Sequence, residues 1–316
     1  MTTPCISLIS PFYNEEASAP LFIERCSAML SGLGSSYEMI FVDDGSSDST
    51  WDILRQAAAA HPEIRAVRLS RNFGHQAALS AALAHSRGDL VVMIDSDLQD
   101  PPEEIPAMIK LMREAGADVV YGVRTERRGV SLPLRLAYKA FYRILRWLSD
   151  IDIPAESGDF RLVTRRVVDI LVSLPEHGRF LRGLTRWVGF KQLPHYYSRD
   201  ARAGGKSHYS LARLVALAAD GIFSFSMKPL RLATVFAGGF GMLSIAAVLY
   251  IVISRLAGNS APQGWPSLAA IMLAGFAALS ILLGIIGEYV GRIFQETRQR
   301  PIYIVDQQAE KSSHQE

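Results

Sequence analysis

Two long apolar runs near the end of the chain constrain its fold more than any other feature. Residues 232–254 and 267–287 are stretches of 23 and 21 residues without a charged side chain. A helix needs about 20 apolar residues to cross a bilayer. A buried helix of a soluble protein can be equally apolar, but two such runs in succession favour a membrane protein. We therefore predict a juxtamembrane helix at 209–231, two transmembrane helices within 232–291 and a tail at 292–316.

Basic residues flank the predicted hairpin unevenly. The two outer ends carry Lys228, Arg231, Arg292, Arg298 and Arg300, and the connecting loop carries Arg255. The positive-inside rule then places both ends in the cytoplasm. The first residues, MTTPCISLIS, lack the basic start of a secretory signal peptide. We expect a multi-pass protein of the inner cell membrane with a cytoplasmic N-terminal domain, residues 1–208.

The N-terminal domain alternates between apolar runs of strand length and helix-like stretches. Strands are predicted at 6–10, 39–42, 64–69, 90–94 and 119–121, and helices at 17–30, 50–60, 76–84 and 103–114. Continuous apolar strands that alternate with helices predict an α/β fold with a mainly parallel sheet covered on both faces. Ligands of such sheets bind at the carboxyl ends of the strands. Polar clusters follow three of these predicted strands, at 13–15, 43–44 and 95–97.

Charge is also distributed unevenly within the domain. Residues 1–123 carry 8 Lys and Arg against 17 Asp and Glu, a net charge of −9, whereas residues 124–213 carry 18 against 8, a net charge of +10. An acidic section followed by a basic one indicates a metal-binding part and an anion-binding part, with ordinary surface variation as the alternative. Of the 33 basic residues 27 are Arg, which suits bidentate phosphate contacts. No basic motif with interleaved aromatic residues is present, so nucleic acid is not an expected partner.

The segment 135–149, RLAYKAFYRILRWLS, carries a basic stripe at helical spacing. Arg135, Lys139, Arg143 and Arg146 recur every three or four residues, with apolar side chains between them. This pattern is typical of a helix that lies on an anionic membrane surface. An ordinary amphipathic surface helix would show the same pattern, and the two predicted spans favour the membrane interpretation.

The motif Asp95-Ser96-Asp97 follows the fourth predicted strand and precedes Gln99. Two carboxylates one residue apart can converge on one point, where a hard divalent cation and a diphosphate would offset their repulsion. With Cys5 and Cys26 as the only cysteines, a Cys-based zinc site or a disulfide scaffold is not expected.

Three segments together carry a family resemblance. They are residues 10–16 (SPFYNEE), 42–48 (VDDGSSD) and 95–103 (DSDLQDPPE), supported by 88–89, 121–124, 158–162 and 199–209. With the two spans, the chain resembles polyprenyl-phosphate glycosyltransferases of glycosyltransferase family two over nearly its whole length. Within this group it is most similar to the bactoprenol (undecaprenyl-phosphate) glucosyltransferases, and more distantly to dolichyl-phosphate mannose synthases. The resemblance implies a nucleotide-sugar-binding domain of the GT-A fold.

The resemblance also implies roles for individual residues. The implied nucleotide-binding set is Pro11, Tyr13, Glu15, Asp43 and Asp95, and the implied ligands of Mg²⁺ or Mn²⁺ are Asp95, Asp97 and Gln99. Arg124 matches an arginine near the acceptor phosphate, with Arg128 or Arg135 as a partner, and Arg199, Arg202 and Lys206 match a basic loop over the donor diphosphate. Asp97, Arg124 and Asp159 form the implied catalytic set. Asp159 is either a general base or, as we prefer, a residue that orients Arg161.

Several of these side chains have simpler interpretations. Asp44 and Asp48 can cap the helix that begins near Thr50, and Tyr13 can serve packing alone. His75 and His85 have no partner pattern and are interpreted as structural or exposed.

The function implied is an inverting transfer of one sugar from a nucleotide sugar, UDP-glucose by resemblance, to a polyprenyl phosphate at the cytoplasmic face. GDP-mannose, UDP-GlcNAc or a UDP-aminopentose are alternative donors, and a non-catalytic nucleotide-sugar-binding scaffold is the alternative of another class. Processive synthesis is disfavoured because Gly183 stands where processive relatives carry Gln in Gln-x-x-Arg-Trp. Relatives commonly associate, so a homo-oligomer is a further expectation.

Overall fold

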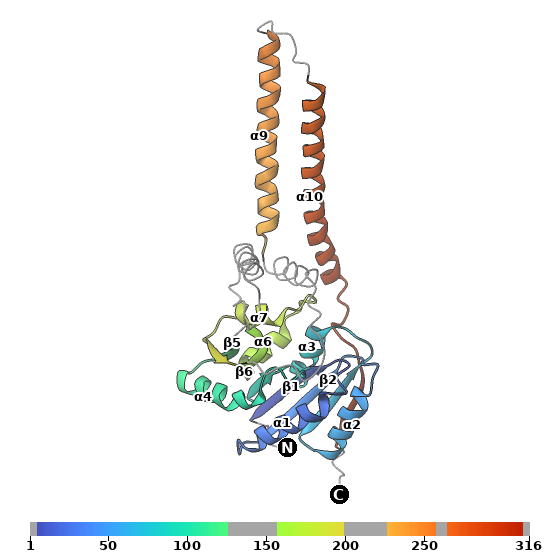
Figure 1. Cartoon of the computed structure of the whole chain (residues 1–316), viewed down its shortest axis with the longest axis vertical. Helices are drawn as coiled ribbons and strands as arrows, with labels where there is room; N and C mark the ends of the chain where they lie inside the picture. Colours follow the sequence, from blue (N-terminus) through green and yellow to red (C-terminus); the bar gives the residue numbers. More distant parts are fainter. Residues whose placement is uncertain (1–4, 126–156, 199–225, 257–263, 312–316) are drawn as a thin grey trace.

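A computed structural model shows an α/β domain from which two long helices rise (Figure 1). The structure describes residues 5–125, 157–198, 226–256 and 264–311. The predicted interfacial helix at 135–149 lies outside these residues, as does most of the predicted juxtamembrane helix.

The centre of the domain is an eight-stranded sheet in the order β7-β5-β6-β4-β1-β2-β3-β8. Its strands are β1 Ile6–Phe12, β2 Tyr37–Asp43, β3 Ile64–Leu69, β4 Leu90–Met93, β5 Val119–Arg124, β6 Ser157–Thr164, β7 Gln192–Tyr197 and β8 Val305–Glu310. The pairs β1–β2, β1–β4, β2–β3 and β5–β7 are parallel, whereas β6 pairs antiparallel with β4 and β5 and β8 pairs antiparallel with β3. The mainly parallel sheet predicted from the sequence is confirmed.

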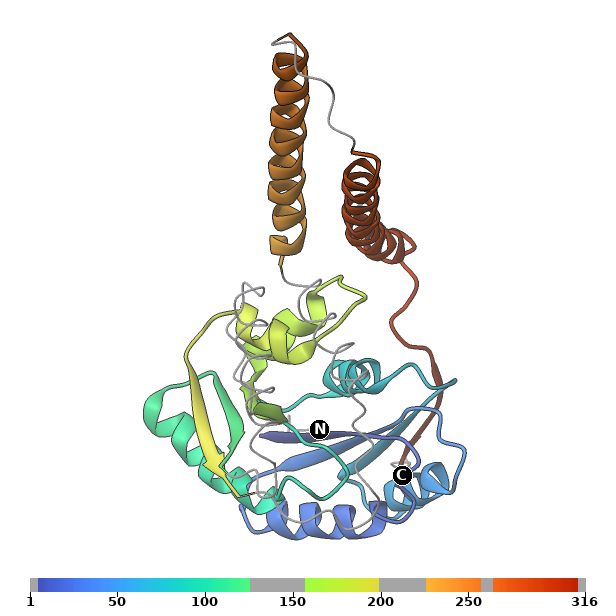
Figure 2. The ribbon, with the colours of Figure 1, turned by 45° about the horizontal axis from the view of Figure 1, so that its top comes forward.

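Helices cover both faces of this sheet (Figure 2). They are α1 Ala19–Ser31, α2 Thr50–Ala60, α3 His75–His85, α4 Ile105–Ala115, α6 Arg165–Ser173 and α7 Leu181–Trp187, with a short 3-10 helix η1 at Pro102–Glu104. Side chains of α1, α2 and α4 join one apolar core, and those of α3, α6 and α7 join another on the opposite face. Every residue of β1 is buried. Leu8 belongs to one core and Ile9 to the other, because successive side chains of a strand point to opposite faces of the sheet.

The two C-terminal helices are α9 Lys228–Leu256 and α10 Trp265–Thr297. Both are long and apolar enough to cross a membrane, and almost none of their apolar surface is buried within the protein. Phe240 of α9 reaches Gly275 of α10, where an added Cβ would lie 3.4 Å from its ring. The helices extend beyond the predicted transmembrane residues 232–291, because residues 228–231 belong to α9 and α10 continues to Thr297.

The segment after α10 is more than the tail predicted at 292–316. It returns alongside the domain (Figure 1) and adds β8 to the sheet edge, where Ala309 pairs with Ala66 of β3. Next to it, the His177 ring lies 2.8 Å from the Glu296 carboxylate of α10. The end of α10 and the chain that follows it are therefore attached to the α/β domain. If the two helices cross a membrane, the domain and the chain after α10 lie on the same side.

Candidate functional site

The loops that follow β1, β2 and β4 are tied together by side-chain hydrogen bonds to the backbone. Ser96 Oγ donates to the carbonyl of Pro11 at 2.9 Å, and the amide of Asn14 donates to Ser46 Oγ at 2.9 Å. The amide of Glu15 donates to Thr50 Oγ1 at 2.9 Å, at the start of α2. The loops thus lie together at the carboxyl ends of the strands, where the sequence predicts a ligand site.

Asp43 ends β2 in a fully buried position. Its Oδ1 accepts a hydrogen bond from the amide of Ser46 at 3.2 Å, and burial raises its pKa. Within the described part of the chain, Oδ2 has no hydrogen-bond partner, although Arg68 Nε lies 3.4 Å away. Arg68 is therefore the charged neighbour of this buried carboxylate.

The other residues predicted to bind the nucleotide lie near the same loops and differ in their exposure. Pro11 is buried within β1, whereas the ring of Tyr13 is 49% exposed and so presents an aromatic surface for stacking. The carboxylate of Glu15 accepts a hydrogen bond from Ser18 Oγ at 2.5 Å, which fixes the turn before α1.

Asp95, after β4, lies in a cluster with His75 and Asp159. The Nε2 atom of His75 is 3.4 Å from Asp95 Oδ1 and 3.3 Å from Asp159 Oδ2. Burial raises the pKa of Asp95 to about 6, and neighbouring carboxylates add to the rise against the charge of His75. Burial alone would lower the pKa of His75, but its hydrogen bond to Asp159 and the nearby negative charges raise it to about 9. One ligand atom from each residue lies within 4.8 Å of the other two, so the three could hold a metal ion.

The remaining predicted metal ligands follow in a tight turn. Asp97 Oδ1 accepts a hydrogen bond from the amide of Gln99 at 3.1 Å, and Leu98 between them has a left-handed φ of 60°. A non-glycine residue in that region is strained and persists because its surroundings fix it. The predicted ligand set and the observed cluster thus share Asp95, and His75 is a potential ligand that sequence reasoning missed.

Asp159 is held by an arginine that the sequence did not indicate. Arg182 Nε donates to Asp159 Oδ1 at 2.7 Å and Arg182 Nη2 donates to Oδ2 at 2.9 Å. Burial would raise the pKa of Asp159, but Arg182 and His75 hold it well below its usual range. These contacts favour an orienting role over a base role, and the arginine oriented is Arg182. Arg161 was the expected partner, but its Nη1 donates to the carbonyl of Arg182 at 3.2 Å.

Arg124, at the end of β5, contacts residues 95–100 after β4, which we call the acidic loop. Its Nη2 lies 3.3 Å from Asp100 Oδ2 and its Nε lies 3.4 Å from the hydroxyl of Tyr197. The Tyr197 hydroxyl donates to Asp100 Oδ1 at 2.5 Å. The sequence motif at 95–103 includes Asp100 without a role of its own, and Tyr197 carries no sequence signal.

Other expectations have mixed outcomes. Asp48 does cap α2, because its Oδ1 accepts from the amide of Thr50 at 3.0 Å. Asp44 does not, because it accepts from the amides of Phe73 and Gly74 before α3. The predicted phosphate-binding residues Arg128, Arg135, Arg199, Arg202 and Lys206 lie outside the described residues.

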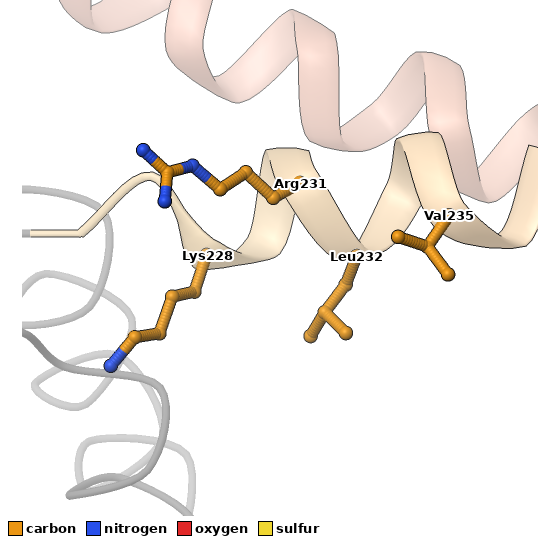
Figure 3. A pocket seen from close by; sticks show the side chains of 4 residues that line it. All are labelled: Lys228, Arg231, Leu232 and Val235. Atoms are coloured by element: carbon orange, nitrogen blue, oxygen red, sulfur yellow. The ribbon is translucent and has the colours of Figure 1, made fainter.

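A shallow hollow lies at the domain end of α9 (Figure 3). It is lined by two basic side chains, Lys228 and Arg231, and by two apolar ones, Leu232 and Val235, one turn further along the helix. Cations beside apolar surface at the start of a long apolar helix are typical of a membrane boundary.

Comparison with known proteins gives consistent matches along the chain. Residues 7–171 match the family described as Glycosyl transferase family 2. Over 302 residues the chain is 42% identical to "Uncharacterized glycosyltransferase YkcC" of Bacillus subtilis, which covers 95% of this chain and 92% of that protein. Over 306 residues it is 36% identical to "Bactoprenol glucosyl transferase" of Shigella phage SfV, covering 97% of this chain and 99% of that protein.

Solved structures resemble the chain more distantly. The mannosyltransferase PcManGT from Pyrobaculum calidifontis, in complex with GDP-Man and Mn²⁺, is 19% identical, with 95% of this chain and 85% of that chain covered and a TM-score of 0.42.

Proposed function

Because this chain belongs to glycosyl transferase family 2, as its motifs predicted, we propose that it transfers one sugar from a nucleotide sugar to a polyprenyl phosphate. The chain is a glycosyltransferase, and its α/β domain has the GT-A fold. The proposed donor is UDP-glucose and the proposed acceptor is undecaprenyl phosphate, in line with the relatives named bactoprenol glucosyl transferase. The observation that supports the proposal is the contact between the acidic loop and Arg124. A cation suited to one phosphate lies there beside carboxylates suited to a metal ion that would bind the other phosphate.

The donor nucleotide would occupy the loops after β1 and β2. Asp43, buried at the end of β2, is the carboxylate that the family resemblance assigns to the nucleoside. The exposed ring of Tyr13 offers a surface for the base. Pro11 and Glu15 shape the same loop. These contacts support binding of a nucleotide without specifying which sugar it carries.

The residues of the acidic loop fit a divalent cation. The carboxylates of Asp97, Asp100 and Asp159 lie near enough to Asp95 to add to the rise of its pKa. Mg²⁺ or Mn²⁺ prefers oxygen ligands and would be held by Asp95, Asp97 and Gln99, with His75 adjacent. When bound, such an ion supplies positive charge that stabilises the leaving diphosphate.

The acceptor phosphate does not require a protein base. A phosphate monoester has a second pKa near roughly 6 and is largely dianionic at neutral pH. Its oxygen forms the bond to the anomeric carbon as the bond from that carbon to the diphosphate breaks, and the nucleoside diphosphate leaves with the electron pair. This single displacement inverts the anomeric carbon. Arg124 would hold the incoming dianion, whose approach to the diphosphate is otherwise unfavourable.

The two apolar helices supply the membrane location that a polyprenyl chain needs. We propose that α9 and α10 span the inner membrane, with the α/β domain on the cytoplasmic face. Lys228 and Arg231 would then lie at the level of lipid phosphates (Figure 3).

The function is tested by incubating the purified protein with polyprenyl phosphate and, separately, UDP-glucose, GDP-mannose, UDP-GlcNAc and a UDP-aminopentose. Mass analysis of the lipid should show one hexose added with UDP-glucose and no further additions. A single addition from another nucleotide sugar would show that this compound, and not UDP-glucose, is the donor. No lipid product from any donor, with a folded protein and added Mg²⁺ or Mn²⁺, would overturn the proposal in favour of a binding scaffold.

The topology is tested by thiol labelling of intact cells, in a background with Cys5 and Cys26 replaced. Gly258→Cys, in the segment between the two helices, should react with an impermeant reagent added outside. Gln307→Cys, exposed on β8, should react after the membrane is opened. Labelling of position 307 in intact cells would contradict a cytoplasmic domain.

A further inference from the structure

Arg124 sits in a three-residue contact that the proposed function does not by itself require. We propose that Asp100 and Tyr197 form a clamp that sets the position and orientation of the Arg124 guanidinium for the acceptor phosphate. The inference rests on the proposed function for what Arg124 binds. It adds two positioning residues and a direct connection between the acidic loop and the acceptor site.

The contacts of the clamp close a triangle. Tyr197 donates its hydroxyl proton to one carboxylate oxygen of Asp100 at 2.5 Å, and Arg124 Nη2 lies 3.3 Å from the other oxygen. The third side is the 3.4 Å approach of Arg124 Nε to the Tyr197 hydroxyl. Two adjacent N–H groups of the guanidinium are engaged from one side, which fixes the plane of the fork.

Two glycines leave the space that the clamp occupies. A Cβ on Gly158 would lie 2.7 Å from Arg124 Nη2, and a Cβ on Gly122 would lie 2.7 Å from the ring of Tyr197. Neither glycine has a positive φ, so the reason for the missing side chain is close approach rather than backbone conformation. The strands β5 and β6 thus accommodate Arg124 and Tyr197 in these positions.

The clamp is anchored at its buried end. Asp100 is fully buried, and the ring of Tyr197 packs edge-on against Phe160 with centroids 5.5 Å apart. Arg124 and Tyr197 are partners in the parallel register of β5 and β7. The Arg124 side chain is 27% exposed. The fixed groups therefore lie inside while the cation reaches the surface, the arrangement expected of a preorganised binding group.

Through Asp100, the clamp connects the proposed acceptor site to the loop proposed for the donor. It follows Gln99 directly, in the same loop as Asp95 and Asp97. The loop proposed to hold the donor diphosphate thus also holds the cation proposed for the acceptor phosphate. An in-line displacement depends on the relative placement of these two phosphates, and a small misplacement lowers the rate strongly.

The test is Tyr197→Phe, which removes the hydroxyl and keeps the ring that packs against Phe160. The KM for polyprenyl phosphate should rise about fivefold to tenfold, as expected for loss of one hydrogen bond to a charged network, with donor affinity unchanged. The matched control is Tyr196→Phe on the same strand, where the side chain is 64% exposed and all constants should stay at wild-type values. In an Arg124→Ala background, Tyr197→Phe should have no further effect on that KM, whereas a merely structural role would add to the loss.

A second measurement does not depend on turnover. Phenylglyoxal modifies accessible guanidinium groups, and peptide mass spectrometry gives the rate at Arg124. Tyr197→Phe should raise that rate severalfold without lowering the thermal midpoint by more than a few degrees, and Tyr196→Phe should not. An unchanged rate overturns the clamp. A raised rate with an unchanged KM overturns its role at the acceptor site. Absence of transfer by the wild-type protein overturns the proposed function and leaves the modification rate as the measure of the clamp.

Discussion

The α/β domain and the helical pair use the same kinds of apolar side chain in opposite ways. Phe22 of α1 is 0% exposed and packs edge-on against Phe12 and Phe41, whereas Phe236 of α9 is 73% exposed. The domain buries its apolar residues in two cores of its own. The helices α9 and α10 leave theirs exposed, as two membrane spans would. The domain therefore covers its own apolar surface, whereas the helical pair does not.

The two regions also differ in where their polar groups lie. In the domain, carboxylates and arginines gather at the carboxyl ends of the strands, several of them buried. In the helical pair, the hydroxyls of Ser244 and Ser280 donate to the backbone of their own helix, and Tyr289 donates to the carbonyl of Ser226 at 2.7 Å near the domain end. We infer that the chemistry belongs to the domain, and that the helices hold it against the lipid phase.

The largest effect is expected at the site, from Asp97→Asn. The amide keeps an oxygen that can accept from the amide of Gln99, so the turn should persist, but the negative charge is lost. We expect transfer to fall about a thousandfold or more, since loss of a metal contact removes several kcal/mol of transition-state stabilisation. The measurement is the initial rate at saturating Mg²⁺ or Mn²⁺, with thermal midpoint as the check on folding.

The matched control for this substitution is Asp52→Asn on α2, where the carboxylate is 61% exposed and lies 3.1 Å from Arg55. Its rate should match that of the wild type. Transfer by Asp97→Asn within tenfold of the wild type, or transfer that survives a chelator, would remove the metal from the mechanism.

The next largest effect is expected on membrane insertion, and it is measured by comparing one substitution in each region. Leu243 of α9 and Leu21 of α1 are both exposed in the isolated protein, at 66% and 47%. Leu243→Asp should lower insertion by about 3 kcal/mol, because a carboxylate in the middle of a span is costly. Leu21→Asp lies in the first turn of a water-exposed helix, where a negative charge is tolerated.

The fraction of protein that resists carbonate extraction from membranes measures this difference. It should fall for Leu243→Asp and stay at the wild-type level for Leu21→Asp. Equal extraction of the two variants would indicate that α9 does not face lipid.

The sequence predicts the parts of the domain whose signals are local. The first five strands and four helices lie where the apolar runs and periodicity indicated, and α2 at Thr50–Ala60 matches its predicted range. By contrast, β6 begins with Ser157, Gly158 and Asp159 and is inserted between β4 and β5 by topology, which local pattern does not encode. Strand β8 reads VDQQAE, an edge strand with mostly exposed polar side chains, and so carries no apolar signal.

The site residues also divide into those with a local sequence signal and those that only folding brings together. The acidic loops were predictable because parallel strands end at one edge of the sheet. His75 and Arg182 were not, because they come from the start of α3 and from α7 and meet Asp159 only in the folded chain. Arg161 illustrates the reason: it is two residues from Asp159 in sequence, and yet the carboxylate is held from another element.

A smaller effect is expected where the chain after α10 rejoins the sheet. Ala309 of β8 is half-buried and packs against the core that includes Ala66. Ala309→Asp should cost about 2 kcal/mol, because a charge is placed against apolar surface. Gln307→Asp on the same strand is exposed and opposite Arg68, so it should not destabilise. Thermal unfolding of the purified protein in detergent compares the two, and equal midpoints would show that β8 contributes nothing to the domain.

The smallest effect concerns the contact between α10 and the domain at His177. Its Nδ1 lies 2.8 Å from Glu296 Oε2 and its Nε2 lies 2.6 Å from the carbonyl oxygen of Arg300. Both partners are acceptors, so both ring nitrogens donate only in the imidazolium form. The hydrogen bond to Glu296 accordingly raises the pKa of His177 against the lowering effect of burial, and the carbonyl of Arg300 adds to the rise.

A histidine pKa that is higher in the folded than in the unfolded protein stabilises the fold at low pH. The stabilisation is complete below the unfolded value near roughly 6.5 and is lost as the pH rises through the raised folded value. His177→Gln should therefore lower the thermal midpoint by about 1–2 °C at pH 6, since the contact is a partly exposed ion pair, and by less as the pH increases. His61→Gln, an exposed histidine at the end of α2, is the control for general effects of histidine loss. A difference between wild type and His177→Gln that stays constant, or grows, with increasing pH would show that this contact does not depend on the charge of His177.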